Sequence, residues 1–233
     1  MPRLPRLSLS ALALPLLGLA TACGSAMPEP AGDDTAAPDA QPPPPPQPDA
    51  PPSPTCTVGL DDVITAHVVV DTDDAYKLWV NGVLIDDLPR SWNTPGVYDV
   101  AILRHPSRRN VIAIEGRNEF NIDGRDRGLI ADVRFTVNGV EQRVATDASW
   151  KINVTSQPGW ETQTFSDAQW PAPVVIGPAG IDPWYSVLDA DAPGSTASWL
   201  WTYDPTPLAA SEKLDLDYAY ARTSFSVVDP ACD

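Results

Sequence analysis

Residue types that could bind a ligand gather in two stretches of this chain. Trp92 stands in a turn-rich segment, which favours an indole ring exposed to solvent, and Trp160 is a second candidate. A sugar has an apolar face and a rim of hydroxyls, so its site needs an aromatic platform with polar groups beside it. The polar run 117–127 offers such groups at Asn118, Asn121, Arg125 and Asp126. A solvated loop is the competing interpretation of that run.

Three acidic residues form a second candidate site. Asp71, Asp73 and Asp74 place closely spaced carboxylates in one segment. Carboxylate oxygens suit a hard cation such as Ca²⁺, which takes six to eight oxygen ligands. Aspartate is also a turn former that hydrogen-bonds its own backbone, and this is the alternative role of all three. No other cofactor is predicted.

Residues for catalysis are scarce. The chain has two histidines, His67 in a strand-like pattern and His105 before a proline, and it lacks a nucleophile elbow, an HExxH zinc motif and a phosphate loop. Glycoside hydrolysis needs two carboxylates about 5 to 10 Å apart. With 31 acidic residues present, such pairs arise by coincidence. We therefore expect that the protein is not an enzyme. A hydrolase is an alternative interpretation.

The overall charge excludes one class of partner. The formal net charge is −16 at pH 7, and no basic stripe interrupts it. A surface this acidic repels phosphate backbones, so we expect no nucleic acid partner.

The elements that must position these residues are strands. Segments rich in β-branched and aromatic residues are bounded by turn formers. The predicted strands are 65–71, 76–80, 97–103, 110–115, 128–137, 141–146 and 218–228. Trp79 and Trp150 lie in strand-like patterns and are expected in the core.

Turn residues define how these strands connect. Asn81-Gly82 and Asn138-Gly139 each stand between valines, which is the strongest short signal for a β-hairpin. Frequent Gly and Pro breakers leave no room for a long amphipathic helix. The sequence therefore predicts one all-β domain over residues 56–233, a sandwich or jelly roll, which contains all eight tryptophans.

Several motifs in this domain resemble galactose-binding-like β-sandwich domains. The run 73–82, Asp-Asp-Ala-Tyr-Lys-Leu-Trp-Val-Asn-Gly, is similar to their signature around a Val-Asn-Gly turn. Further similar passages are 98–100, 109–115, 146–151, 159–160, 167–170 and 183–184, in the same order and spacing. Such domains occur in rhamnosidase-type glycoside hydrolases and in carbohydrate-binding modules, and they are generally the non-catalytic parts of their enzymes.

One motif departs from the family order. The passage 220–225, Tyr-Ala-Arg-Thr-Ser-Phe, resembles a strand that normally opens such domains, but here it stands near the end of the sequence. A circular permutation would explain this position, because the terminal strands of a jelly roll lie close together. An unrelated final strand is the alternative.

The first 22 residues have the pattern of an export signal. Arg3 and Arg6 precede an apolar run over 7–20, which is short for a membrane span, and small residues lead to Cys23. This ending resembles the lipobox of bacterial lipoproteins, whose cysteine is lipidated and becomes the mature N-terminus. The resemblance implies a membrane anchor at Cys23, and a plain secretory signal is the alternative. With Gly24 next, the resemblance also implies an outer-membrane or cell-surface location.

A stalk and a cross-link complete the predicted organisation. Residues 23–55 are mostly Pro, Ala, Asp and Gln without hydrophobic periodicity, which is typical of a disordered, extended spacer. With Cys23 assigned to lipid, Cys56 and Cys232 remain at the two ends of the domain. In an oxidising compartment this pair predicts a disulfide that joins the terminal strands, worth about 4 to 5 kcal/mol for so long a loop.

The sequence therefore predicts a lipid-anchored, stalk-borne β-sandwich that binds carbohydrate without catalysis. A structural or protein-interaction module of the cell envelope is the alternative.

Overall fold

The computed structural model describes residues 56–87, 92–119, 127–185, 188–203 and 217–232. The predicted signal segment 1–22 and stalk 23–55 lie outside these residues, and so do Cys23, Asn121, Arg125 and Asp126. The described residues fall in one compact unit, Ala50–Asp233. Within them, we find no helix with the length and apolar character needed to cross a membrane.

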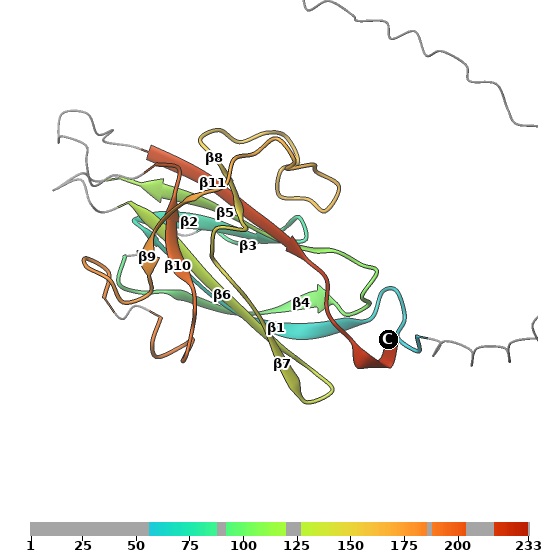
Figure 1. The fold of residues 1–233 in the computed structure, drawn as a ribbon. Coiled ribbons are helices and arrows are strands. Elements are labelled where there is room, and N and C mark those ends of the chain that lie inside the picture. The colour runs from blue at the N-terminus through green and yellow to red at the C-terminus, as the bar shows by residue number, and fades with distance from the viewer. Residues whose placement is uncertain (1–55, 88–91, 120–126, 186–187, 204–216, 233) are drawn as a thin grey trace, which may run out of the picture. The chain divides into compact units, whose positions relative to one another are not determined.

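The domain consists of two antiparallel sheets (Figure 1). The first sheet has the order β4-β1-β6-β10-β9, and β7 also pairs with β6. Its strands are β1 (Val63–Asp73), β4 (Gly96–Leu103), β6 (Gly128–Val137), β7 (Val140–Ala145), β9 (Val174–Pro178) and β10 (Ser198–Trp201). The second has the order β3-β2-β5-β11-β8. Its strands are β2 (Ala75–Val80), β3 (Val83–Asp86), β5 (Asn110–Asn118), β8 (Lys151–Asn153) and β11 (Asp217–Phe225), and the 3-10 turn η2 (Pro230–Cys232) follows.

The core lies where alternate residues of both sheets meet. Ala66, Val68 and Val70 of β1 are fully buried and belong to the same cluster as Ile112 and Ile114 of β5. A strand side chain alternates between the two faces, so one set of alternate apolar residues fills the space between the sheets. The predicted β-sandwich is thus confirmed, and its two antiparallel sheets fit the galactose-binding-like type. The circular permutation stays a prediction.

Long loops cover the outer faces of the sandwich and bury aromatic rings there. The loop between β8 and β9 places Trp160 and Trp170 in a cluster with Val111 and Ala113, and Trp79 packs against it. Trp160 is only 5% exposed. The expectation of an exposed Trp160 ring is therefore wrong, because the loop folds back onto β5 and β11. Trp150, as expected, is buried between the sheets.

Both Asn-Gly hairpins form as predicted. Asn81 and Asn138 have φ of 53° and 49°, and the glycine after each has φ of 84°. Positive φ at both central residues is the geometry of a type I′ turn, which matches the twist of paired strands. Val80 pairs with Val83, and Val137 pairs with Val140.

The predicted disulfide between Cys56 and Cys232 is present. We expected the terminal strands to be neighbours, but they are not. β1 pairs with β4 and β6, whereas β11 lies between β5 and β8 in the other sheet. The cross-link can form because Cys56 precedes β1 and Cys232 lies in η2, so both cysteines stand outside the sheets.

Candidate functional site

An aromatic hollow of about 400 Å³ lies where the segment before β4 meets the loop between β9 and β10. Its lining residues are Trp92, Asn93, Pro95, Trp184, Tyr185, Ala190 and Asp191. Two of the aromatic rings are open to solvent, since Trp92 is 39% exposed and Tyr185 is 60% exposed. We call these seven residues the aromatic hollow.

Trp184 forms the fixed base of the aromatic hollow. Its ring stacks on Trp199, with the ring centroids 4.2 Å apart. Its Nε1 donates a hydrogen bond to Asp73 Oδ2 at 2.8 Å, and the side chain is only 2% exposed. A stacked and hydrogen-bonded indole has little freedom to move. The position of the next residue, Tyr185, is therefore well defined.

Tyr185 is turned outward by its backbone. Its φ is 40°, in the left-handed region that a bulky residue rarely adopts. Two hydrogen bonds hold this conformation: the Tyr185 N–H donates to the Ile181 carbonyl and the phenol donates to Asp182 Oδ1, both at 2.7 Å. Unfavourable φ values of this kind persist where the surroundings enforce them, and they cluster at ligand-binding sites.

The phenol of Tyr185 stays a hydrogen-bond donor at neutral pH. Its hydrogen bond to Asp182 and the negative charge of that carboxylate raise the pKa of Tyr185 above its ordinary value. The ring is thus uncharged, and its face remains available to a ligand.

The opposite wall of the aromatic hollow is anchored to the first sheet. Arg134 Nη2 donates to the Asp191 carbonyl at 2.5 Å. Ser195 Oγ donates to Asp132 Oδ2 at 2.6 Å, and Arg143 lies 3.3 Å from the same carboxylate. Asp132 of β6 is fully buried, so the Ser195 hydrogen bond ties the loop to β6, while the Arg143 ion pair joins β7 to the same carboxylate.

Chemically, the aromatic hollow can stack a flat apolar face and hydrogen-bond the polar groups around it. Trp92 and Tyr185 offer ring faces, while Asn93 and Asp191 offer donors and acceptors at the edge. This is the combination that a sugar ring requires.

The structure brings together only part of the predicted site. Trp92 lies in the aromatic hollow. Asn118 is fully buried at the end of β5, where it pairs with Asp217 of β11, so its amide is not on the surface. The sequence does not predict Tyr185, because a single Tyr after Pro-Trp carries no signal that distinguishes an exposed ring from a buried one.

The three aspartates near the end of β1 each meet different donors. Asp71 Oδ1 accepts the Thr72 N–H at 2.9 Å, and Asp74 Oδ2 accepts the Glu119 N–H at 2.8 Å. Asp73 accepts the Trp184 hydrogen bond described above. These are backbone-ordering and ring-anchoring roles, close to the turn role considered for all three. The calcium site stays a prediction.

His67 also has a defined position. Its Nδ1 lies 2.9 Å from Asp99 Oδ1, beside a surface hollow of about 570 Å³ on β1 and β6. The residues that line this hollow include neither Ser nor Cys. Thr65 and Thr136 are the hydroxyl-bearing residues among those that line it.

No family model matches the chain, and no curated protein matches it either. Among solved structures, the chain is similar to a Streptomyces avermitilis alpha-L-rhamnosidase complexed with L-rhamnose, at 22% identity and a TM-score of 0.46. The match covers 71% of this chain and 20% of the rhamnosidase, so it involves about a fifth of that enzyme.

Proposed function

We propose that this domain is a carbohydrate-binding module without catalytic activity, and that the aromatic hollow is its binding site. The observation that carries the proposal is the pair of solvent-exposed rings, Trp92 and Tyr185, that line one hollow with polar groups at its edge. A sugar ring would stack on one of them and hydrogen-bond to Asn93 or Asp191.

The module is carried outside the cell in this proposal. The export signal and the lipobox-like ending at Cys23 support a lipid anchor, and a stalk over 23–55 would hold the domain away from the membrane. The Cys56–Cys232 disulfide supports the same location, because disulfides persist in oxidising compartments.

A glycan array with the purified full-length chain tests the binding function. We expect binding to at least one glycan, and we expect Trp92→Ala and Tyr185→Ala each to lower affinity by about tenfold or more. Tyr185→Phe should retain most of the affinity, because it keeps the ring. Leu84→Ala is the control for loss of an exposed apolar side chain, since Leu84 is 49% exposed and outside the aromatic hollow.

The thermal midpoint separates a lost site from a lost fold. An exposed ring contributes little to the core, so Trp92→Ala should unfold at nearly the wild-type temperature. A loss of several kcal/mol would mean that Trp92 is structural. A native chain that binds no glycan on a broad array would contradict the proposal.

The second candidate function is a protein-interaction module. One observation favours it: the edge strands β3 and β4 border an open hollow of about 640 Å³ whose lining residues are mostly apolar. Val83 and Val97 in it are 63% and 41% exposed. An edge strand is paired on one side only, and with apolar side chains it can accept an extended segment of another chain on the other side. A negative glycan array would give this candidate first place.

A further inference from the structure

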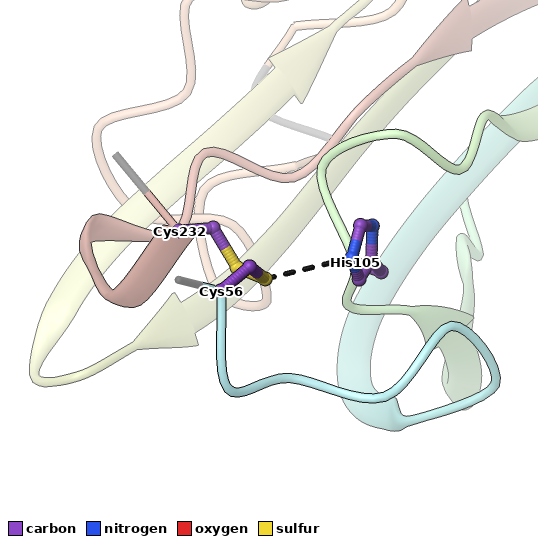
Figure 2. A group of neighbouring side chains, drawn as sticks. All are labelled: Cys56, His105 and Cys232. Atoms are coloured by element: carbon purple, nitrogen blue, oxygen red, sulfur yellow. Dashed lines mark hydrogen bonds between the residues drawn. A yellow bond between two sulfur atoms is a disulfide. The ribbon is translucent and has the colours of Figure 1, made fainter. Parts of the chain in front are cut away.

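A histidine lies beside the disulfide. His105, in the loop between β4 and β5, places its Nε2 3.5 Å from Cys56 Sγ (Figure 2). The imidazole nitrogen and the two sulfur atoms all lie within 4.8 Å of one another, and all three residues are partly exposed. The group therefore lies near the surface of the domain.

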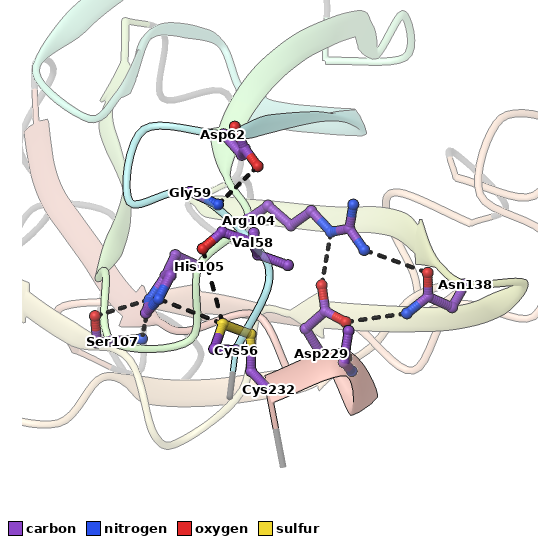
Figure 3. The surroundings of a disulfide bond; sticks show 11 residues. Cys56, Val58, Gly59, Asp62, Arg104, His105, Ser107, Asn138, Asp229 and Cys232 are labelled. Atoms are coloured by element: carbon purple, nitrogen blue, oxygen red, sulfur yellow. Dashed lines mark hydrogen bonds and ion pairs between the residues drawn. A yellow bond between two sulfur atoms is a disulfide. The ribbon is translucent and has the colours of Figure 1, made fainter. Parts of the chain in front are cut away.

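The hydrogen bonds of Ser107 determine what His105 does there. The Ser107 backbone N–H donates to His105 Nδ1 at 3.1 Å, and the Ser107 hydroxyl lies 2.8 Å from the same nitrogen (Figure 3). A backbone N–H can only donate, so Nδ1 must be the acceptor. The neutral ring then carries its proton on Nε2, where it faces the Cys56 sulfur.

This tautomer argues against a metal site. The three residues would be chemically suitable ligands for zinc if the disulfide were reduced. Coordination through Nε2 would move the proton to Nδ1, directly against the Ser107 N–H. The geometry therefore favours His105 as a hydrogen-bond donor to sulfur.

A second group near Cys56 has the opposite effect to His105 on the protonation of a free Cys56 thiol. The Val58 carbonyl oxygen lies 3.8 Å from Cys56 Sγ and would favour a protonated thiol. The imidazole donor is closer, at 3.5 Å, and a donor stabilises the thiolate. The nearer group has the larger effect, so the surroundings of Cys56 favour the thiolate on balance.

Contacts other than the disulfide hold both cysteines in place. Buried Asp229 accepts hydrogen bonds from Arg104 Nε at 2.6 Å and from the Ala231 N–H at 3.0 Å, and its carbonyl accepts the Cys232 N–H at 2.9 Å. On the other side, the Arg104 N–H donates to the Asp62 carbonyl at 2.8 Å. Arg104 thus links both chain segments, and reduction leaves these bonds intact.

We propose that Cys56–Cys232 is a thiol-exchange site with a fixed polarity, in which a dithiol attacks Cys232 and Cys56 is the leaving group. One thiolate of the dithiol forms a bond to Cys232 Sγ, the S–S bond breaks, and its electron pair goes to Cys56 Sγ. The Cys56 thiolate accepts the hydrogen bond from His105 Nε2. The second thiolate of the dithiol then attacks the dithiol sulfur bound to Cys232. Cys232 leaves as a thiolate, so the dithiol is oxidised and the protein disulfide is reduced.

The polarity follows from the leaving group. A thiolate that is better stabilised leaves faster. Cys56 has the His105 donor, whereas in the described part of the chain no hydrogen bond to Cys232 Sγ is present. Attack on Cys232 is thus the faster of the two possible exchanges.

Glutathione, a monothiol, tests this polarity in the oxidised full-length chain. After a short reaction at pH 7, acid quenching and peptide mapping should find about ten times more glutathione on Cys232 than on Cys56. His105→Leu should lower the exchange rate about tenfold and remove the preference. His105→Gln should restore part of the preference, because its amide can donate from a similar position.

His67→Ala is the matched control, because His67 is the only other histidine and lies on β1, paired with Asp99. It should leave the rate and the preference unchanged. Equal rates and an equal product ratio in the wild type and His105→Leu would overturn the proposal, and so would preferential labelling of Cys56. Zn²⁺ retained by the reduced chain and lost in His105→Leu would overturn the assigned role of Nε2. Equal thermal midpoints of the oxidised variants exclude unfolding as the cause.

Discussion

At the residue scale, buried charges organise the end of the sandwich that carries the aromatic hollow. Arg127 is fully buried, and its Nε lies 3.3 Å from Asp217 Oδ2. The same carboxylate oxygen accepts hydrogen bonds from Trp201 Nε1 at 3.2 Å and from the Tyr203 hydroxyl at 2.6 Å. Burial and this hydrogen bond raise the pKa of Tyr203 far above its ordinary value. A buried carboxylate with several donors is ordered and difficult to replace.

The lowered pKa of Asp229 predicts how the stability of the fold depends on pH. The Ala231 N–H, followed by Arg104 and Asn138, lowers the pKa of Asp229 below its ordinary value, against the opposing effect of burial. A carboxylate with a lowered pKa stabilises the fold above the unfolded pKa of about 4, and this contribution disappears as pH falls through the lower folded value. We expect Asp229→Asn to lower the free energy of unfolding most at neutral pH, with the difference from wild type shrinking below about pH 4.

Urea unfolding at pH 7 and at pH 3 measures this effect. Asp61→Asn is the matched control, because the Asp61 side chain is 92% exposed and its only described ion pair, with Arg108, is 3.8 Å long. It should change little at either pH. A difference between wild type and Asp229→Asn that stays constant between pH 3 and pH 7 would contradict the assigned pKa.

At the element scale, the sequence predicts the long strands and misses the short ones. The predicted strands at 65–71 and 128–137 are present as β1 and β6, because many alternating β-branched residues give a clear period-two pattern. β8, β9 and β10 have three, five and four residues. Such segments are too short for periodicity, and only their pairing with neighbouring strands makes them strands.

The sequence predicts one exposed ring of the aromatic hollow and not the other. Trp92 was identified as an exposed ring because its neighbours are turn formers, which is a local signal. Tyr185 lies in the hollow because Trp184 is fixed against Trp199 and Asp73, residues that are distant in the chain. Its outward position depends on tertiary contacts, so the sequence alone could not predict it.

Gly128, at the start of β6, tests whether the stacked tryptophans position the aromatic hollow. A Cβ there would lie 2.7 Å from Trp199 Cε3 and 3.0 Å from Trp184 Cζ2, too close for the stacked rings. We expect Gly128→Ala to cost about 1 to 3 kcal/mol of stability. Because displaced Trp184 would move Tyr185, glycan binding should weaken as well. Thermal or urea unfolding and the glycan assay measure the two effects.

Gly139 is the matched control for Gly128→Ala. Its φ is 84°, but a Cβ there would meet no atom within 4 Å. Gly139→Ala should therefore cost about 1 kcal/mol from backbone strain alone and leave binding unchanged. If Gly128→Ala were as mild as Gly139→Ala, or left binding intact, the tryptophan stack would not position the hollow.

At the scale of the whole molecule, loops of the domain cover the outer faces of both sheets. The cluster of Trp184, Trp199 and Leu188 covers the outer face of one sheet, and Trp160 with Trp170 covers the outer face of the other. The domain thus has three apolar layers rather than one. The disulfide joins the segment before β1 to the segment after β11, and the Arg104–Asp229 ion pair joins the loop between β4 and β5 to that same final segment.

The lipid anchor is the prediction that belongs to the whole molecule. Metabolic labelling with a palmitate analogue should mark the protein, and fractionation of a two-membrane bacterium should place it with the outer membrane. Cys23→Ala should abolish the label and release the chain into the soluble fraction, because it removes the atom that would carry the acyl group. The Cys56→Ser/Cys232→Ser variant is the control and should remain labelled, since these two cysteines form the disulfide. A label that persists in Cys23→Ala would contradict the anchor.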